Sequence, residues 1–212
     1  MENILLMIKK PKTFFEKMER GRIQFLPFVI IIIIYIISTF ITKNLFADYL
    51  KEMIFTTENM APTDLDYIIK NQTIISFIIN PGLPILGIIV KSYLINGISA
   101  FDGYGEFKDA LNVVSYSYIV AAVGNLIQSI LSIALNNYGF RLTITNLLHL
   151  NQSSYAAQIL NEITPFVVYY QILAVIGIAV LYQVSYKRSS IFVIGTWATW
   201  LLIISGIRTI SF

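Results

Sequence analysis

A run of nineteen residues with no charged side chain, residues 24–42, constrains this chain more than any other feature of its sequence. The hydrocarbon core of a bilayer is about 30 Å thick, so an α-helix needs about 20 apolar residues to cross it. The composition agrees, because 56% of the residues are hydrophobic and only 13% are charged, where a soluble domain has about 25% charged residues. We therefore expect an integral membrane protein and exclude a water-soluble globule.

Four further apolar stretches have the length of a membrane span, and they cover residues 73–99, 113–135, 163–186 and 190–207. They are too long and too uniformly apolar for transmembrane strands, which have roughly ten residues of alternating polarity. The sequence therefore predicts an all-α protein, a polytopic bundle of five transmembrane helices. Because only residues 186–189 separate the last two spans, these spans should form an antiparallel hairpin.

Lysine and arginine residues are concentrated before the first span and after the fourth. The two long connections at the other end are acidic or rich in uncharged polar residues. In membrane proteins the cytoplasmic loops carry the excess of basic residues. We expect the N-terminus to be cytoplasmic and, with five spans, the C-terminus to lie outside.

Residues 1–23 form a cytoplasmic amphipathic segment ahead of the membrane domain, which covers residues 24–212. Pro11 divides this segment, and residues 12–19 predict a short helix whose aromatic side, with Phe14 and Phe15, faces lipid. A basic interfacial helix is attracted to anionic lipid by about 1 kcal/mol per basic residue near the surface. The segment is either an anchor that orients the first span or an arm that docks a partner.

The sequence lacks the side chains that thiolate sites and multi-histidine sites need. The chain has no cysteine and a single histidine, His149, which excludes thiolate chemistry and multi-histidine metal clusters. Ser99 lies in the pattern of a membrane serine protease nucleophile, but His149 is expected at the opposite end, too far away to act as its base. We expect a protein without enzymatic activity, cofactor, metal or nucleic-acid partner.

Lys91 is the one clear charge within a predicted span. A charge at this depth costs from about 2.5 kcal/mol upward, so such groups usually face a bundle interior or a cavity. Lys91 either lies in a wet cavity, where it contacts an anionic ligand or a partner, or reaches the cytoplasmic surface. In the second case it snorkels from a tilted helix or pairs with a carboxylate near that surface, for which the candidates are Asp102, Glu106 and Asp109.

The second span contains a further irregularity at residues 80–84, which include two prolines. Two prolines remove two backbone donors, so the helix should kink or partly unwind there. Broken helices form substrate sites in transporters, typically as a matched pair, and this chain has no second break of that kind. Asn80 is therefore a candidate ligand or partner contact, as are two polar residues of the third span, Asn125 and Gln128.

The order of several segments is characteristic. Residues 8–15 combine three lysines, a proline and two phenylalanines just before the first span. Residues 101–111 form a glycine-rich turn with the pair Phe107-Lys108, and two tyrosines follow at the start of the third span. The closing hairpin has a basic turn at residues 184–188. Together these segments resemble the Yip domain family, whose name refers to interaction with Ypt/Rab GTPases, and in particular its bacterial members.

This resemblance implies a five-helix bundle with a cytoplasmic N-terminus and a non-enzymatic role. Eukaryotic relatives organise vesicle traffic, and some bacterial relatives look like accessory proteins of ABC exporters that protect against antimicrobial peptides. The long acidic N-terminal tail of the eukaryotic members is missing here, so GTPase binding is not transferred. We expect an adaptor in a bacterial cytoplasmic membrane that assembles with, or regulates, a transport complex. Its partner would be transporter subunits or a second copy of the chain.

Such an adaptor needs contact residues on its cytoplasmic side. The candidates lie in the N-terminal segment, the glycine-rich turn and the closing hairpin: Phe14, Phe15, Gly103, Gly105, Phe107, Lys108, Lys187 and Arg188. The alternative function is a small oligomeric transporter or channel that uses Lys91 and the broken second helix. The sequence leaves the partner, any ligand and the oligomeric state open.

Overall fold

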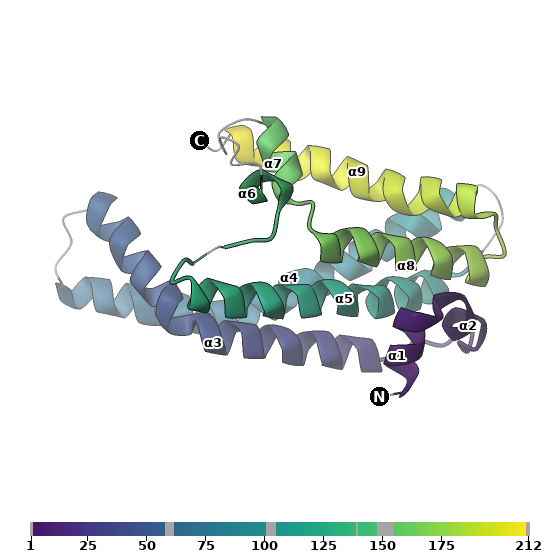
Figure 1. Cartoon of the computed structure of the whole chain (residues 1–212), viewed down its shortest axis with the longest axis horizontal. Helices are drawn as coiled ribbons and strands as arrows, with labels where there is room; N and C mark the ends of the chain where they lie inside the picture. Colours follow the sequence, from purple (N-terminus) through teal and green to yellow (C-terminus); the bar gives the residue numbers. More distant parts are fainter. Residues whose placement is uncertain (1, 58–61, 101–104, 139, 148–154, 211–212) are drawn as a thin grey trace.

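The structure is a computed structural model that describes residues 2–57, 62–100, 105–138, 140–147 and 155–210, with side chains of the last helix described as far as Leu202. Every regular element within these residues is a helix, which confirms the all-α prediction. In chain order they are α1 (Glu2–Lys9), α2 (Pro11–Glu16), α3 (Leu26–Thr57), α4 (Pro62–Ala100), α5 (Phe107–Ala134), α6 (Ile144–Leu147), α7 (Tyr155–Asn161), α8 (Pro165–Leu181) and α9 (Tyr186–Ile210) (Figure 1).

Within the part of the chain that the structure describes, three helices are long and apolar enough to cross a membrane, which makes this a multi-pass membrane protein. The apolar ranges of these candidate spans are Leu26–Ile54, Leu65–Ser99 and Phe107–Ala134, and a fourth candidate results if α7 and α8, bent by 69°, count as one. The 17 residues of α8 alone rise only about 25 Å, less than the bilayer core. The count of five spans therefore stays a prediction.

The second span is not broken. Pro81 and Pro84 lie inside α4, and this helix continues without interruption from Pro62 to Ala100. Of the two expected outcomes, a kink and a partial unwinding, the unwinding is therefore wrong, and the alternative function loses the broken helix on which it partly depended. Two missing backbone donors leave two carbonyl groups of one turn unpaired, and a helix of 39 residues retains enough other hydrogen bonds to pass through this turn.

The last two helices form the expected antiparallel hairpin, but its turn lies elsewhere (Figure 1). The turn consists of residues 182–185, and α9 already begins at Tyr186. Gln183 supplies the change of direction with a φ of 56°, in the left-handed region. The predicted turn residues Lys187 and Arg188 therefore belong to the first turn of α9.

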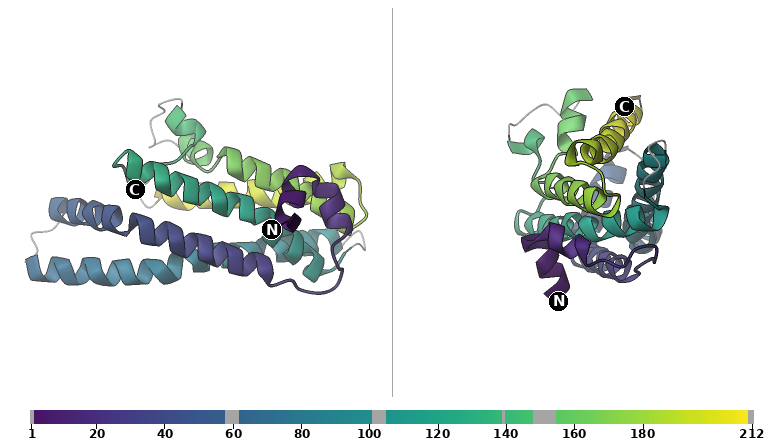
Figure 2. Two further views of the ribbon diagram at one scale, coloured as in Figure 1. Left: turned by 60° about the horizontal axis from the view of Figure 1, so that its bottom comes forward. Right: turned by 90° about the vertical axis from the view of Figure 1, so that its right-hand side faces the viewer.

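Helix α5 is the centre of the bundle and packs on α3, α4 and α8, as the view along the bundle shows (Figure 2). All residues from Asp109 to Ser117 are buried, so this part of α5 is covered on every side. Two glycines allow the close approach of its neighbours. A Cβ atom on Gly124 would lie 2.3 Å from the Phe166 side chain, and one on Gly177 would lie 2.6 Å from Val113 Cγ1.

The N-terminal segment packs into the bundle and does not turn its aromatic side to lipid. Helix α1 lies across the bundle axis at one end (Figures 1 and 2), and Tyr169 on α8 donates a hydrogen bond to the Ile8 carbonyl at 2.8 Å. Phe15 is fully buried, and the Phe14 ring packs edge-on against Tyr116 on α5 at 5.1 Å. The lipid-facing expectation is wrong because the small side of α8 at Gly177 admits the Phe15 ring.

We predict that Gly177→Ala destabilises the fold by about 1–3 kcal/mol, because the new methyl group overlaps Val113 and Phe15. Gly87→Ala on α4 is the matched control, since a Cβ there meets nothing within 4 Å. That variant should be neutral or up to about 1 kcal/mol more stable, because alanine favours helix over glycine. Unfolding by SDS titration in mixed micelles measures both variants. Equal effects would contradict the packing described here.

Candidate functional site

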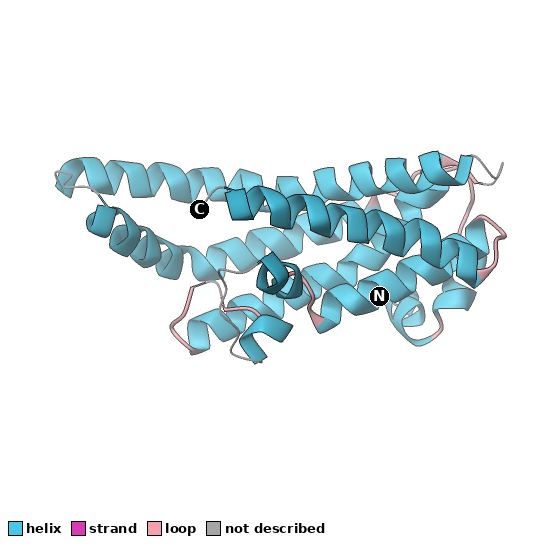
Figure 3. Ribbon diagram, turned by 90° about the horizontal axis from the view of Figure 1, so that it is seen from above, coloured by secondary structure: helices cyan, strands magenta, loops and turns pink. Residues whose placement is uncertain are grey.

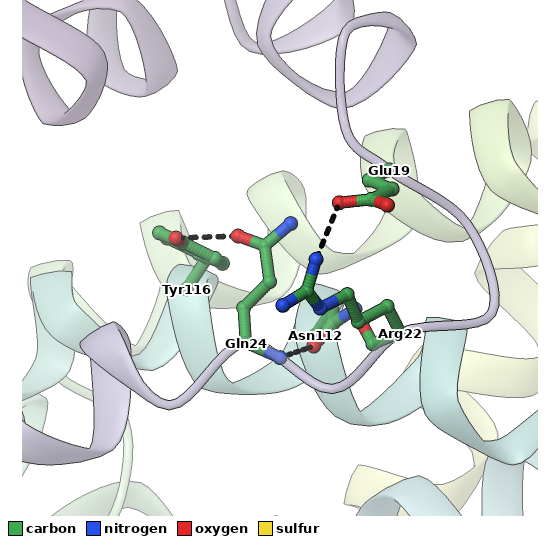
Figure 4. A network of polar contacts seen from close by, with 5 residues as sticks. All are labelled: Glu19, Arg22, Gln24, Asn112 and Tyr116. Atoms are coloured by element: carbon green, nitrogen blue, oxygen red, sulfur yellow. Dashed lines mark hydrogen bonds and ion pairs between the residues drawn. The ribbon is translucent and has the colours of Figure 1, made fainter.

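A network of hydrogen bonds joins the irregular chain before α3 to the first turns of α5 (Figure 4). The backbone nitrogens of Gly21 and Gln24 donate to Asp109 Oδ1 at 3.0 Å and to Asn112 Oδ1 at 2.9 Å. Asn112 Nδ2 donates to the Arg22 carbonyl at 2.7 Å, and the Tyr116 hydroxyl donates to Gln24 Oε1 at 2.7 Å. The three side chains of α5 are spaced by three and four residues, which places them on one face.

These contacts supply hydrogen-bond partners to backbone groups that lie outside any helix. Asn112 is fully buried and offers an acceptor and a donor to the passing chain, as a neighbouring strand would. The Glu19–Arg22 ion pair beside it, at 3.7 Å, is exposed and contributes little. The network therefore fixes where the N-terminal segment ends and α3 begins, and we name Asp109, Asn112 and Tyr116 the α5 polar face.

Tyr182 closes the same end of the bundle. Its hydroxyl lies 3.2 Å from Asn96 Oδ1 on α4 and 3.1 Å from the Glu106 carbonyl just before α5. Its ring lies against Gly105, where a Cβ atom would come within 2.2 Å and where φ is 80°. Burial raises the pKa of Tyr182; a hydrogen bond with Ser99 partly offsets this and the nearby charge of Asp109 adds to it, so the group stays a protonated donor.

The cytoplasmic docking candidates occupy three different environments. Phe14 and Phe15 are core residues and present no surface, while Gly105 is needed for the contact with Tyr182. Gly103 lies outside the described residues. Phe107 is half-buried beside Tyr93. The remaining candidates are exposed: Lys108, Lys187 and Arg188.

Lys91 lies inside the bundle between α4 and α8. Its Nζ donates to Gln171 Oε1 at 2.5 Å and stands 4.3 Å from the centre of the Tyr170 ring. Among the described residues no carboxylate pairs with it, and Asp109 is engaged by the Gly21 nitrogen. Asp102 lies outside the described residues. The Lys91 side chain thus points towards a neutral amide and an aromatic face of the bundle.

Further tyrosines extend this polar cluster to α3 and α5. Tyr170 packs edge-on against Tyr118 at 5.3 Å, and the hydroxyl groups of Tyr118 and Tyr35 lie 3.0 Å apart. The buried Gln171 Nε2 has no hydrogen-bond partner among the described residues. The cluster therefore keeps one unused buried donor beside an ammonium group, an arrangement that would accept a water or an anion.

The other candidate contacts within the spans do not join Lys91. Asn80 lies eleven residues away on α4, about 16 Å along the axis, and donates to Thr39 Oγ1 at 3.0 Å. Gln128 bonds the Gly124 carbonyl and the Leu142 nitrogen, both at 3.2 Å. Asn125 is half-buried one turn before Gln128 on α5. Asn80 and Gln128 thus hold neighbouring segments together, as polar groups commonly do in helical membrane proteins.

The sequence analysis did not predict that the α5 polar face bonds the chain before α3. It also did not predict that Tyr170 and Gln171 contact Lys91. A signal for the first was present, because three side chains able to hydrogen-bond recur at positions i, i+3 and i+7, on one face of the helix. No comparable signal linked Lys91 to Gln171, since their positions are 80 residues apart.

Apolar spans around a buried polar interior define a polytopic helical membrane protein. A family model described as the Yip1 domain matches residues 5–207, nearly the whole chain. The chain therefore belongs to the Yip1 domain family, which confirms the resemblance and covers the N-terminal segment as well as the bundle. No curated protein and no solved structure gives a significant match.

We predict that Asn112→Leu destabilises the protein by about 2–3 kcal/mol, because the Gln24 nitrogen and the Arg22 carbonyl both lose their partner. Asn125→Leu, the same change on the same helix, should cost under about 1 kcal/mol, since the described residues give Asn125 no hydrogen bond. The free energy of unfolding in mixed micelles tests both. If Asn112→Leu proves as stable as wild type, the network does not hold the entry to α3.

Proposed function

We propose that this protein is a non-enzymatic membrane accessory protein that assembles with, or regulates, a membrane transport complex. The observation that carries this proposal is the length of α3 and α4. With 32 and 39 residues, they rise about 48 Å and 58 Å, whereas the bilayer core is about 30 Å thick. A pair of packed helices therefore extends well beyond the membrane at one end.

This extension is visible where α3 and α4 project past the ends of the other helices (Figures 1 and 3). We name residues 50–57 and 62–70 the helical arm. Its base is marked by Phe46 and Tyr49, whose rings pack on Tyr138 at 5.2 Å and 5.1 Å, as expected of an aromatic belt at a membrane surface. Beyond this base, Tyr67 is 68% exposed. Exposed aromatic side chains of this kind are common anchors of protein interfaces.

The orientation follows from the distribution of charge. Nine of the fifteen lysines and arginines belong to α1, α2, the chain before α3 and the starts of α5 and α9, which share the end opposite the arm (Figure 1). The positive-inside rule puts that end in the cytoplasm and the arm outside. The family resemblance suggests an ABC exporter of the bacterial cytoplasmic membrane as the complex.

Lys187 and Arg188 support a second contact surface on the cytoplasmic side. Both are exposed in the first turn of α9, where positive side chains are unfavourable to the helix dipole by some tenths of a kcal/mol. Helix stability therefore does not account for these two basic side chains, and their exposure supports contact with an acidic surface.

The test is an affinity pull-down from mildly solubilised native membranes, with bound proteins identified by mass spectrometry. We expect transporter subunits near stoichiometry with wild type and a loss of at least tenfold with Tyr67→Ala, because an exposed aromatic anchor is removed. Tyr93→Ala is the matched control, since Tyr93 is 70% exposed but lies near the other end of α4, where its ring faces Phe107. Lys187→Glu/Arg188→Glu, tested in parallel, reports on the cytoplasmic surface. Recovery of a homo-oligomer alone would refute the accessory role.

One observation favours a second candidate, the small oligomeric transporter or channel. Lys91 carries a charge at membrane depth without a carboxylate partner among the described residues, and Gln171 Nε2 beside it is unpaired. In that case Lys91→Leu should abolish solute or ion flux in liposomes of the purified protein. Under the accessory proposal, Lys91→Leu leaves partner recovery nearly unchanged, so a folded Lys91→Leu protein that loses its partner would show that the two functions are not separable in this way.

A further inference from the structure

A groove of about 410 Å³ lies between the N-terminal segment and the turn that joins α8 to α9. One side contains Lys12 and Arg20 together with Glu16, so it is basic by one charge. The other side is formed by the end of α8 and the turn, where Ala179, Val180 and Val184 supply apolar side chains. The groove is therefore amphipathic, with cations facing aliphatic groups.

The basic side is available for an anion. Lys12 has one ion pair, with Glu16 at 3.8 Å, and both side chains are at least half exposed, so this pair contributes little. Arg20 is held by a neutral group, because Gln183 Oε1 accepts from Nη1 at 3.0 Å and from Nη2 at 3.2 Å when its amide is oriented towards the guanidinium. Two cations and one carboxylate line the groove, which gives it a net charge of +1.

The neighbouring cleft shows that this charge is specific to the groove. That cleft, of about 500 Å³, shares Arg20 and Gln183 but is also lined by Glu106 and Asp109. Its ionisable side chains sum to a charge of −1. An anion arriving at this end of the bundle is therefore directed to the groove and away from the cleft.

We propose that the groove binds an anionic phospholipid, with Lys12 and Arg20 on its phosphate and Ala179, Val180 and Val184 along the first part of an acyl chain. The guanidinium retains further N–H donors, and a phosphate matches its planar geometry. The apolar wall favours a lipid over a soluble phosphate, since only a lipid buries that wall. The position also fits, because the groove lies at the end of the bundle where α1 runs across the bundle axis (Figure 1).

Native mass spectrometry of the full chain in detergent, titrated with dioleoyl phosphatidylglycerol or phosphatidylcholine, tests the proposal. We expect tighter binding of phosphatidylglycerol and at least about tenfold weaker binding in Lys12→Gln/Arg20→Gln, since each basic residue near an anionic surface contributes about 1 kcal/mol. Lys51→Gln/Lys70→Gln is the matched control. It removes the same charge from exposed positions at the opposite end and should stay within twofold of wild type.

Two further arms separate the possible sources of the phosphate. Inorganic phosphate and glycerol phosphate should not displace the lipid at equal concentration, and Val184→Asn should weaken lipid binding although no charge changes. If the double variant does not fold, Lys12→Gln alone, at an exposed position, should weaken binding several-fold. Equal binding of both lipids, an equal loss in the control, or displacement by inorganic phosphate would overturn the proposal. None of these outcomes depends on the protein partner proposed above.

Discussion

The structure depends on the need to satisfy backbone groups where little water is present. The chain between the N-terminal segment and α3 is irregular, and it passes over the buried start of α5. Asp109 and Asn112 accept hydrogen bonds from two of its backbone nitrogens, and Asn112 also donates a hydrogen bond to one of its carbonyls. Each backbone group left unpaired here would lower the stability of the fold by about 1–3 kcal/mol. Because these contacts set where α3 begins, they also position α1 and α2 against α8.

The two polar clusters of the bundle differ in how completely they are satisfied. At the α5 polar face the described donors and acceptors match, so this cluster serves the fold. Around Lys91 the balance is incomplete, because an ammonium group faces a neutral amide whose nitrogen has no partner. Polar groups at membrane depth that lack hydrogen-bond partners are common at sites of ligand binding or conformational change. The case for Lys91 as a functional position therefore rests on this cluster and does not need a broken α4.

Much of the fold and part of the candidate site could be predicted from hydropathy, charge and motif order. Three spans follow from hydropathy, and the family follows from the segments around Lys9 to Phe15 and Gly103 to Lys108. The prediction for the N-terminal segment and the open choice for Lys91 both concern two surfaces for the same side chain, whereas the unwinding of α4 and the position of the last turn concern the backbone. Phe14 and Phe15 suit lipid and a protein core equally well, and Lys91 has the reach for either the surface or the interior.

The sequence by itself determined that this chain is a helical membrane protein of the Yip1 domain family, because length, apolarity and motif order are local properties of the chain. Only the tertiary structure decided which groups meet. It brought Gly177 opposite Phe15, Lys91 next to Gln171, and Arg20 beside the end of α8. It also decided that α3 and α4 outreach their neighbours. These outcomes depend on how helices distant in sequence pack, and close packing is set by the shapes of both partners together.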